Sequence, residues 1–236
     1  MPQEKKRPGV CRLAFLASIP VLTGYMILGI GFGILLASKG FGAPWALAMG
    51  AFIYAGSMQF VAVDLLAGGA SLVNSALMTL MVNARHLFYG VSMIEKYRGA
   101  GRKKLYLIFG LTDETYSLLC SGEVPEGVEL HTYQLLVTLF DHCYWTLGCL
   151  LGGLIGSVLP FELAGIEFVL TALFVSIFVE QWLSTKDHIP AIIGVLCTLL
   201  CLLIFGSQSF LIPAMLLITL SLALLKLARK GAQHDE

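Results

Sequence analysis

The sequence carries little charge. Asp, Glu, Lys and Arg together make up 13% of its 236 residues, whereas an ordinary soluble domain carries about 25%. The 15 basic and 15 acidic side chains cancel to a net charge of zero, so the composition indicates no nucleic-acid partner. Hydrophobic residues make up 57% of the chain and the mean hydropathy is +0.83. This composition excludes an ordinary soluble domain.

Motifs of soluble enzymes are also missing. The chain has no HExxH, P-loop or GxSxG motif, and no GxGxxG motif before a helix. Its six cysteines form no CxxC pair and lie mostly inside apolar segments, so we interpret them as small buried hydrophobic residues. Histidine and cysteine are scattered along the chain, and we therefore expect neither a metal site nor a cofactor.

Several apolar runs exceed the ~20 residues needed to span a bilayer. They predict an all-α polytopic membrane protein, with about eight hydrophobic segments in a single transmembrane domain over 1–236. The first run follows a basic head but is longer than the apolar core of a signal peptide, so we expect it to be retained. The segments lie at about 13–38, 44–68, 71–94, 105–121, 133–157, 163–183, 188–205 and 209–226.

The second segment is polar at its centre, in the stretch Ala55-Gly56-Ser57-Met58-Gln59-Phe60. In hydrocarbon a broken helix is tolerated only where protein or water covers it. Glycine-interrupted segments of this kind indicate a transporter binding site. We expect a break near Gly56 and Ser57, so that the following half-helix offers its free N–H groups and its dipole to an anion. A kink used only for helix packing is the alternative.

Basic residues gather in the head 1–12, in the loop 95–104 and in the tail, which together hold 12 of the 15 Lys and Arg. The positive-inside rule assigns all three regions, and therefore both termini, to the cytoplasm. If every segment crossed, the loop 95–104 would lie outside. Re-entry of segments two and six would return both the loop and the tail to the cytoplasm.

A weak internal similarity supports this arrangement. At an offset of 122 residues, Gly31 falls on Gly153 and Gln59 falls on Gln181. The sequence therefore predicts two inverted repeats, 13–121 and 133–226, each with a broken or re-entrant second segment. The alternative is that the similarity is chance and that one basic loop violates the charge rule.

Small residues predict close helix packing at two places. Gly29 and Gly33 form a GxxxG motif in segment one, and Gly148, Gly152 and Gly156 form a similar ridge in segment five. Such ridges allow another helix to approach closely.

Ionisable groups inside the segments are functional candidates by default. Arg85 is the only Arg or Lys within a segment and lies ~13 Å from its end. It is either a counter-ion for substrate or proton, or one half of a structural pair. Asp113 and Asp141 each lie about 12 Å deep and are candidate proton carriers, with Glu114 and His142 beside them. Alternatively, Asp113 merely neutralises Arg85.

With these motifs placed, the chain resembles the azaleucine-resistance (AzlC-type) family, the large subunits of branched-chain amino-acid exporters. The similarity extends over nearly the whole chain. The residues that carry it are Gly29 to Gly33, Tyr54-Ala55-Gly56-Ser57-Met58-Gln59-Phe60, Asn83-Ala84-Arg85-His86, Leu111-Thr112-Asp113-Glu114, Gly165-Ile166-Glu167-Phe168 and Thr171-Ala172-Leu173-Phe174.

The resemblance implies export of leucine, isoleucine, valine and sometimes methionine across the bacterial inner membrane, together with a small subunit of about four spans. We therefore predict a carrier rather than an enzyme, driven by protons. An uptake carrier or channel for another small solute, an intramembrane enzyme and a packing subunit are the alternatives. The candidate substrate-binding residues are Tyr54, Gly56, Ser57, Gln59 and Arg85, and the candidate proton-coupling residues are Asp113, Glu114, Asp141 and His142.

Overall fold

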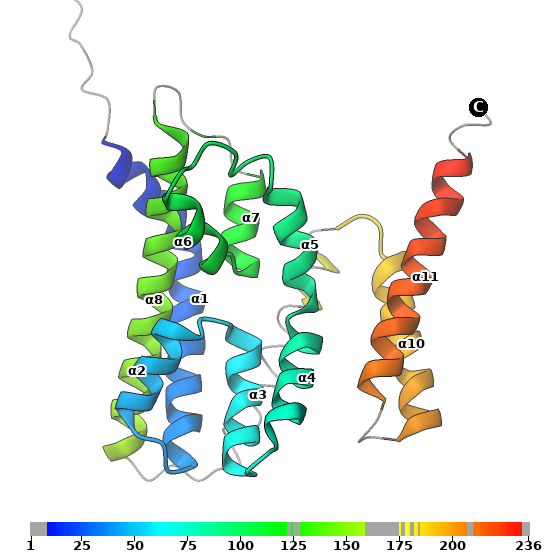
Figure 1. Ribbon diagram of the computed structural model, residues 1–236, viewed down its shortest axis with the longest axis horizontal. Coiled ribbons are helices and arrows are strands. Elements are labelled where there is room, and N and C mark those ends of the chain that lie inside the picture. Colours follow the sequence, from blue (N-terminus) through cyan, green and yellow to red (C-terminus); the bar gives the residue numbers. More distant parts are fainter. Residues whose placement is uncertain are drawn as a thin grey trace, which may run out of the picture. The chain divides into compact units, whose positions relative to one another are not determined.

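The chain forms two compact units, Met1–Leu170 and Thr171–Glu236. All regular structure in the described residues is helical, which confirms the all-α prediction (Figure 1). Predicted segment six, at about 163–183, lies almost entirely outside the described residues. The structure, a computed structural model, describes residues 9–121, 124, 128–158, 175, 178–179, 182–183, 185–206 and 210–232.

The first unit is built on two long helices, α1 (Val10–Ser38) and α8 (Leu130–Val158). Each has 29 residues and is apolar enough to cross a membrane. They run side by side in the same direction (Figure 1), and the rings of Phe15 and Phe140, in corresponding parts of the two helices, have centroids 5.6 Å apart.

Glycines hold these two helices unusually close. A Cβ atom added at Gly29 would lie 2.9 Å from the Cys149 nitrogen, and one added at Gly33 would lie 2.6 Å from the Gly152 carbonyl carbon. Real Cβ atoms essentially never approach other heavy atoms to within 3.0 Å. The predicted packing function of both glycine ridges is therefore confirmed.

The second predicted segment is broken into two helices, α2 (Ala43–Phe52) and α3 (Gly56–Ala67). Between them Tyr54 has a φ of +43°, a left-handed conformation that ends α2 and turns the chain back. The Lys39 Nζ atom, just after α1, lies 3.8 Å from an Asp64 carboxylate oxygen, so α3 returns to the end where α2 begins. The predicted break is confirmed, and it lies just before Gly56.

The third segment also consists of two helices, α4 (Leu72–Val82) and α5 (Ala84–Met93). The Ser71 hydroxyl caps α4 by accepting a hydrogen bond from the Asn74 amide. Asn83 interrupts the segment with a non-helical φ and ψ of −92° and 5°. Together α4 and α5 lead the chain back across the first unit (Figure 1).

The fourth predicted segment is not one continuous helix, so its predicted crossing is not confirmed. It forms a second hairpin, α6 (Lys103–Phe109) and α7 (Asp113–Ser121). Gly110 ends α6, and the Thr112 hydroxyl caps α7 by accepting from the Thr115 amide. These helix-stop and helix-start signals turn the chain back before it has crossed.

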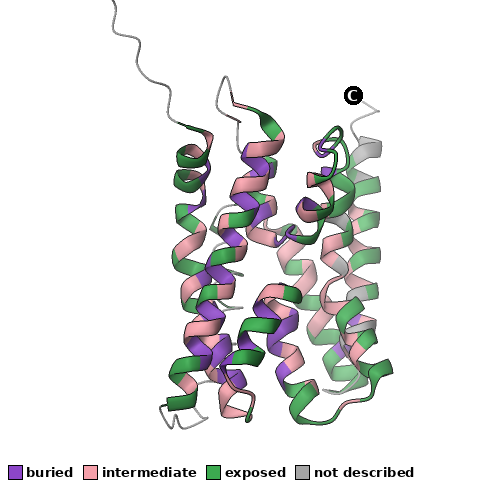
Figure 2. Cartoon of the chain, turned by 60° about the vertical axis from the view of Figure 1, so that its left-hand side comes forward, coloured by how far each residue is buried: buried purple, intermediate pink, exposed green. Residues whose placement is uncertain are grey.

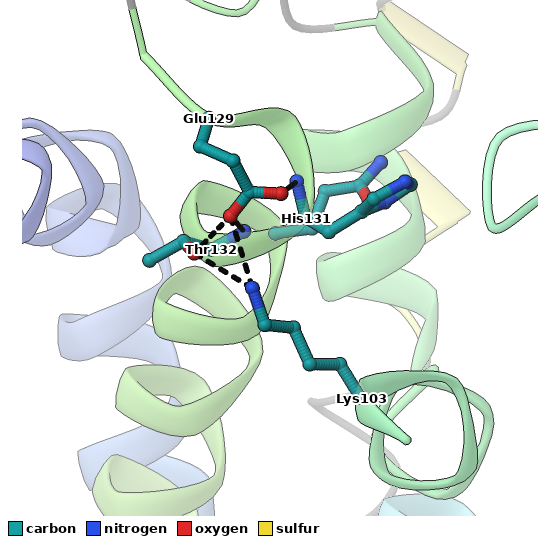
Figure 3. Close-up of polar contacts among 5 residues, drawn as sticks. Lys103, Glu129, His131 and Thr132 are labelled. Carbon is teal, nitrogen blue, oxygen red and sulfur yellow. Dashed lines mark hydrogen bonds and ion pairs between the residues drawn. The ribbon is translucent and has the colours of Figure 1, made fainter. Parts of the chain in front are cut away.

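An ion pair shows where the second hairpin begins (Figure 3). The Lys103 Nζ atom, at the start of α6, lies 2.9 Å from a carboxylate oxygen of Glu129, just before α8. Glu129 also accepts hydrogen bonds from the Thr132 and His131 amides. Hydrogen bonds from Thr132 and then from Lys103 lower the pKa of Glu129 to about 2, so the carboxylate remains ionised at neutral pH.

The two hairpins thus enter the unit from opposite ends. The head and the loop 95–104 share one end, as predicted, because Ala14 and Tyr97 belong to the same buried cluster. A crossing fourth segment would place the loop at 122–131 at the opposite end of the unit. Instead, the end of α7 lies beside the loop 95–104, because Lys96 donates to the Cys120 carbonyl over 2.6 Å. Because the second hairpin does not cross, α1 and α8 run in parallel. They therefore cannot begin repeats of opposite orientation, and the predicted repeats at 13–121 and 133–226 are not confirmed.

This topology predicts a labelling pattern. In a variant that lacks the native cysteines, cysteines placed at Arg98 and Val128 should react with an impermeant maleimide from the same side of the membrane. A cysteine at Ala67, at the end of α3, should react from the other side. Labelling of positions 98 and 128 from opposite sides would mean that the α6–α7 hairpin crosses after all.

Many of the exposed residues, green in Figure 2, are large and apolar. Leu72 is 89% exposed and Leu105 is 78% exposed. Apolar patches of this extent are typical of surfaces that meet lipid or another protein.

The second unit contains α10 (Ile189–Phe205) and α11 (Leu211–Ala232), which agree with predicted segments seven and eight. The two helices are antiparallel, since Arg229 near the end of α11 pairs with Asp187 just before α10.

Candidate functional site

The three broken segments of the first unit all break at one level, beside the middles of α1 and α8. Arg85, just after the break between α4 and α5, contacts Ser57 in the first turn of α3 and Asp113 in the first turn of α7. Tyr25, in the middle of α1, contacts Thr112 at the turn of the second hairpin. Three helices end at this level and three begin there, so negative C-terminal and positive N-terminal dipole ends lie close together.

Arg85 joins the three breaks. Its Nη1 atom lies 2.8 Å from Asp113 Oδ2, and its Nη2 atom donates to the Ser57 hydroxyl over 2.7 Å. The Arg85 side chain is 36% exposed and that of Asp113 is 29% exposed. The Arg85 Nε and Asp113 Oδ1 atoms are buried and have no hydrogen-bond partner among the described residues. The pair therefore keeps one buried donor and one buried acceptor that no described residue satisfies.

A cavity of about 330 Å³ adjoins these breaks. It begins at Tyr54, Ala55 and Asn83 and extends to Tyr97 and Lys104 at the end of the unit that carries the basic loop. Its volume is at the lower limit of the ~300–1,000 Å³ common for small-molecule sites. Its other lining residues are mainly apolar: Ile53, His86, Leu87, Gly90, Met93, Ile94, Ile108, Phe109 and Leu111.

Gln59 and Gly56 shape the turn of the first hairpin. Gln59 is fully buried, and its side-chain oxygen accepts hydrogen bonds from the Ala55 amide and, over 2.8 Å, from the Trp145 indole nitrogen of α8. A Cβ atom at Gly56 would lie 3.6 Å from the Trp145 ring. Of the predicted substrate-binding residues, Tyr54 lines the cavity, Ser57 and Arg85 lie at the break, and Gln59 and Gly56 face α8.

His142 connects the two hairpins. Its Nδ1 atom lies 2.7 Å from the Tyr106 hydroxyl in α6, and its Nε2 atom lies 3.2 Å from the Ala51 carbonyl near the end of α2. One neutral tautomer satisfies both contacts, with Nε2 donating and Nδ1 accepting. Its ring also packs on Tyr54, with centroids 4.4 Å apart. His142, which the sequence predicted as a proton carrier, thus contacts one helix of each hairpin.

The two remaining acids lie at the ends of a chain of three hydroxyl groups, which we call the hydroxyl chain. Glu114 Oε2 accepts from the Tyr25 hydroxyl over 2.7 Å, and Asp141 Oδ2 accepts from the Thr115 hydroxyl over 2.8 Å. Between them, the Thr112 oxygen lies 2.6 Å from that of Tyr25 and 3.1 Å from that of Thr115. Asp141 is fully buried, and its second oxygen has no partner among the described residues.

Sequence reasoning identified both acids but missed the hydroxyl groups between them. Thr112 belongs to the motif that carries the family resemblance, and its position before two acids is a helix-cap signal. Nothing in the pattern around Tyr25 indicates that it contacts residues nearly 90 positions away. Its role depends on the packing of α1 against the second hairpin.

Comparison with known proteins supports a transport function. The family model described as AzlC protein matches residues 20–159, which include every site residue described above. The chain is 46% identical to the branched-chain amino acid transport protein AzlC of Bacillus subtilis, over 95% of this chain and 87% of that protein.

Other relatives are named as membrane proteins. An uncharacterized membrane protein of Haemophilus influenzae is 42% identical over 90% of this chain and 88% of its own length. The inner membrane protein YgaZ of Escherichia coli is 28% identical over 70% of each chain. No solved structure matches the chain.

Proposed function

Because the chain belongs to the AzlC family, we propose that it is a carrier that exports branched-chain amino acids across the bacterial cytoplasmic membrane. The observation that carries the proposal is the meeting of three helix breaks at Arg85, beside a cavity of about 330 Å³. Unwound backbone within a membrane-spanning protein is tolerated where it lines a substrate path.

The dipole ends suit a zwitterionic substrate. A substrate carboxylate fits the positive N-terminal ends of α3 and α5, beside Ser57 and Arg85. The ammonium group fits the carbonyl groups at the end of α2. An aliphatic side chain of the size of leucine fits the apolar part of the cavity, along Leu87, Met93 and Ile108.

The orientation of the cavity agrees with export, since an exporter loads its substrate from the cytoplasm. The cavity extends toward Lys104 and the loop 95–104, which the positive-inside rule assigns to the cytoplasm. We therefore interpret the conformation as inward-facing, ready to load substrate from the cytoplasm. Both termini are cytoplasmic in this proposal, and the chain forms one transmembrane domain that acts with a small four-span subunit.

Proton coupling is assigned to Glu114 and Asp141. Asp113 is paired with Arg85, and His142 is engaged with both hairpins, whereas neither Glu114 nor Asp141 takes part in an ion pair among the described residues. A buried carboxyl group without a cationic partner is the kind of group that exchanges protons within a membrane.

Leucine counterflow tests the proposal. Gly90 lines the cavity, and no atom lies within 4 Å of a Cβ atom built there, so Gly90→Leu fills the cavity without meeting the backbone. In vesicles that contain both subunits and unlabelled leucine, the parent protein should accumulate labelled leucine transiently. We expect Gly90→Leu to lower the initial rate by about tenfold or more.

The matched control is Gly24→Leu, because Gly24 in α1 also has open space around its Cβ position and does not line the cavity. It should behave like the parent protein. A channel would give no transient accumulation, and parent-like counterflow by Gly90→Leu would place the substrate path elsewhere, as it would if this chain were only a packing subunit.

A further inference from the structure

The hydroxyl chain has one contact more than it has hydrogen atoms. Four short contacts connect Glu114 to Asp141 through Tyr25, Thr112 and Thr115. Each contact needs one hydrogen atom, and each hydroxyl group has only one to donate. If both acids are ionised, one pair of oxygen atoms must therefore face each other without a hydrogen.

The shortest of the four contacts makes this shortage explicit. With both acids ionised, Tyr25 donates to Glu114, Thr115 donates to Asp141, and Thr112 can donate to only one of its two neighbours. If Thr112 donates to Thr115, the oxygen atoms of Tyr25 and Thr112 lie 2.6 Å apart with no hydrogen between them. If Thr112 donates to Tyr25 instead, the oxygen atoms of Thr112 and Thr115 lie 3.1 Å apart with no hydrogen between them. In either case two buried oxygen lone pairs face each other and repel, most strongly at 2.6 Å.

One additional proton removes the conflict. If Glu114 is protonated, it donates to Tyr25, and every hydroxyl group then donates toward Asp141. If Asp141 is protonated instead, every hydroxyl group donates toward Glu114. From this count we propose that Glu114 and Asp141 share a single proton that moves between them along the hydroxyl chain.

The transfer is balanced. The proton leaves one carboxyl oxygen, each hydroxyl group passes on its own hydrogen as it receives another, and the opposite carboxylate gains a proton. The total charge of the site stays the same. This inference rests on the proposed proton coupling, for which the chain would provide the internal path.

Other polar groups surround the chain. Tyr54 contacts the Tyr25 ring edge-on, with centroids 6.5 Å apart, and its buried hydroxyl has no hydrogen-bond partner among the described residues. The Arg85–Asp113 ion pair lies beside the chain, because Asp113 directly precedes Glu114 in α7. On α8, Tyr144 lies one turn from Asp141 and contacts the Ser18 hydroxyl. The second Asp141 oxygen is buried and has no hydrogen-bond partner among the described residues.

Infrared spectroscopy of the reconstituted protein tests the shared proton without any transport measurement. The parent should show one protonated buried carboxyl group at neutral pH. Because an amide can donate as a protonated acid does, Glu114→Gln should leave Asp141 ionised, and Asp141→Asn should leave Glu114 ionised. Each single variant should therefore lose the protonated carboxyl band. No such band in the parent, or its loss in only one variant, would overturn the proposal.

Transport variants test the path itself. Thr115→Val removes the hydroxyl group at nearly constant volume, and Thr115→Ser keeps it. As a control, Thr138→Val removes a buried hydroxyl that donates to the Gln134 carbonyl and is not part of the hydroxyl chain. We expect Thr115→Val to lower proton-driven leucine efflux by about tenfold or more while leucine–leucine exchange continues. The other two variants should retain both activities.

The outcomes separate the two proposals. Parent-like efflux by Thr115→Val would overturn the path. If the parent itself moves no protons with leucine, the proposed coupling fails, but the infrared result still decides whether the two acids share a proton.

Discussion

Replacing Gly33 by alanine is expected to prevent α1 and α8 from packing as they do in the native protein. A methyl group there would lie 2.6 Å from the Gly152 carbonyl carbon, and closer still to the Cys149 oxygen and the Gly153 nitrogen. Overpacking a core costs about 1–3 kcal/mol and occasionally more. We expect at least the upper end of this range, because all three obstacles are backbone atoms that cannot rotate away.

The measurement is the folded fraction of detergent-solubilised protein in size-exclusion chromatography, together with its Tm. Gly24→Ala is the control, since it makes the same chemical change in the same helix where no atom lies within 4 Å. Gly33→Ala should aggregate or melt well below the parent, and Gly24→Ala should not. A parent-like Tm for Gly33→Ala would mean that the two helices lie farther apart than the structure has them.

Replacing Arg85 by alanine is expected to abolish leucine export. The change removes the ion pair to Asp113 and the hydrogen bond to Ser57, which hold the three helix breaks together. Truncating one member of a hydrogen-bonded charge pair costs enough to lower activity by about a hundredfold. Arg85→Lys should restore export only in part, because lysine lacks the planar fork that contacts two partners at once.

A double variant decides between the two roles of Arg85 that the sequence left open. Arg85→Gln combined with Asp113→Asn removes both charges and leaves no carboxylate without a partner. If Arg85 served only to neutralise Asp113, the double variant would regain export. We expect it to remain inactive, because in the proposed function Arg85 also binds the substrate carboxylate. The assay is leucine efflux from vesicles, normalised to the amount of protein inserted.

The candidate site was partly predictable from the sequence. A charged residue in a long apolar run has few alternatives to a buried polar partner, so Arg85, Asp113 and Asp141 were identified by their depth alone. Polar residues that are common in membrane helices carry no such signal. Tyr25 and Thr115 could not be assigned for this reason, although Tyr25 contacts Glu114 and Thr115 contacts Asp141.

The amino-acid sequence by itself determined that the chain is a helical membrane protein, that its second segment breaks near Gly56, and that glycine ridges bring two helices together. These features follow from local composition, because hydrocarbon penalises charge and exposed backbone wherever they occur. Only the tertiary structure decided that the fourth segment turns back at Gly110, and that the two hairpins meet at Arg85. A short apolar run with a glycine and a capping threonine is compatible with a bent span or with a hairpin. The choice depends on contacts with distant residues, such as Lys103 with Glu129 and Tyr25 with Glu114.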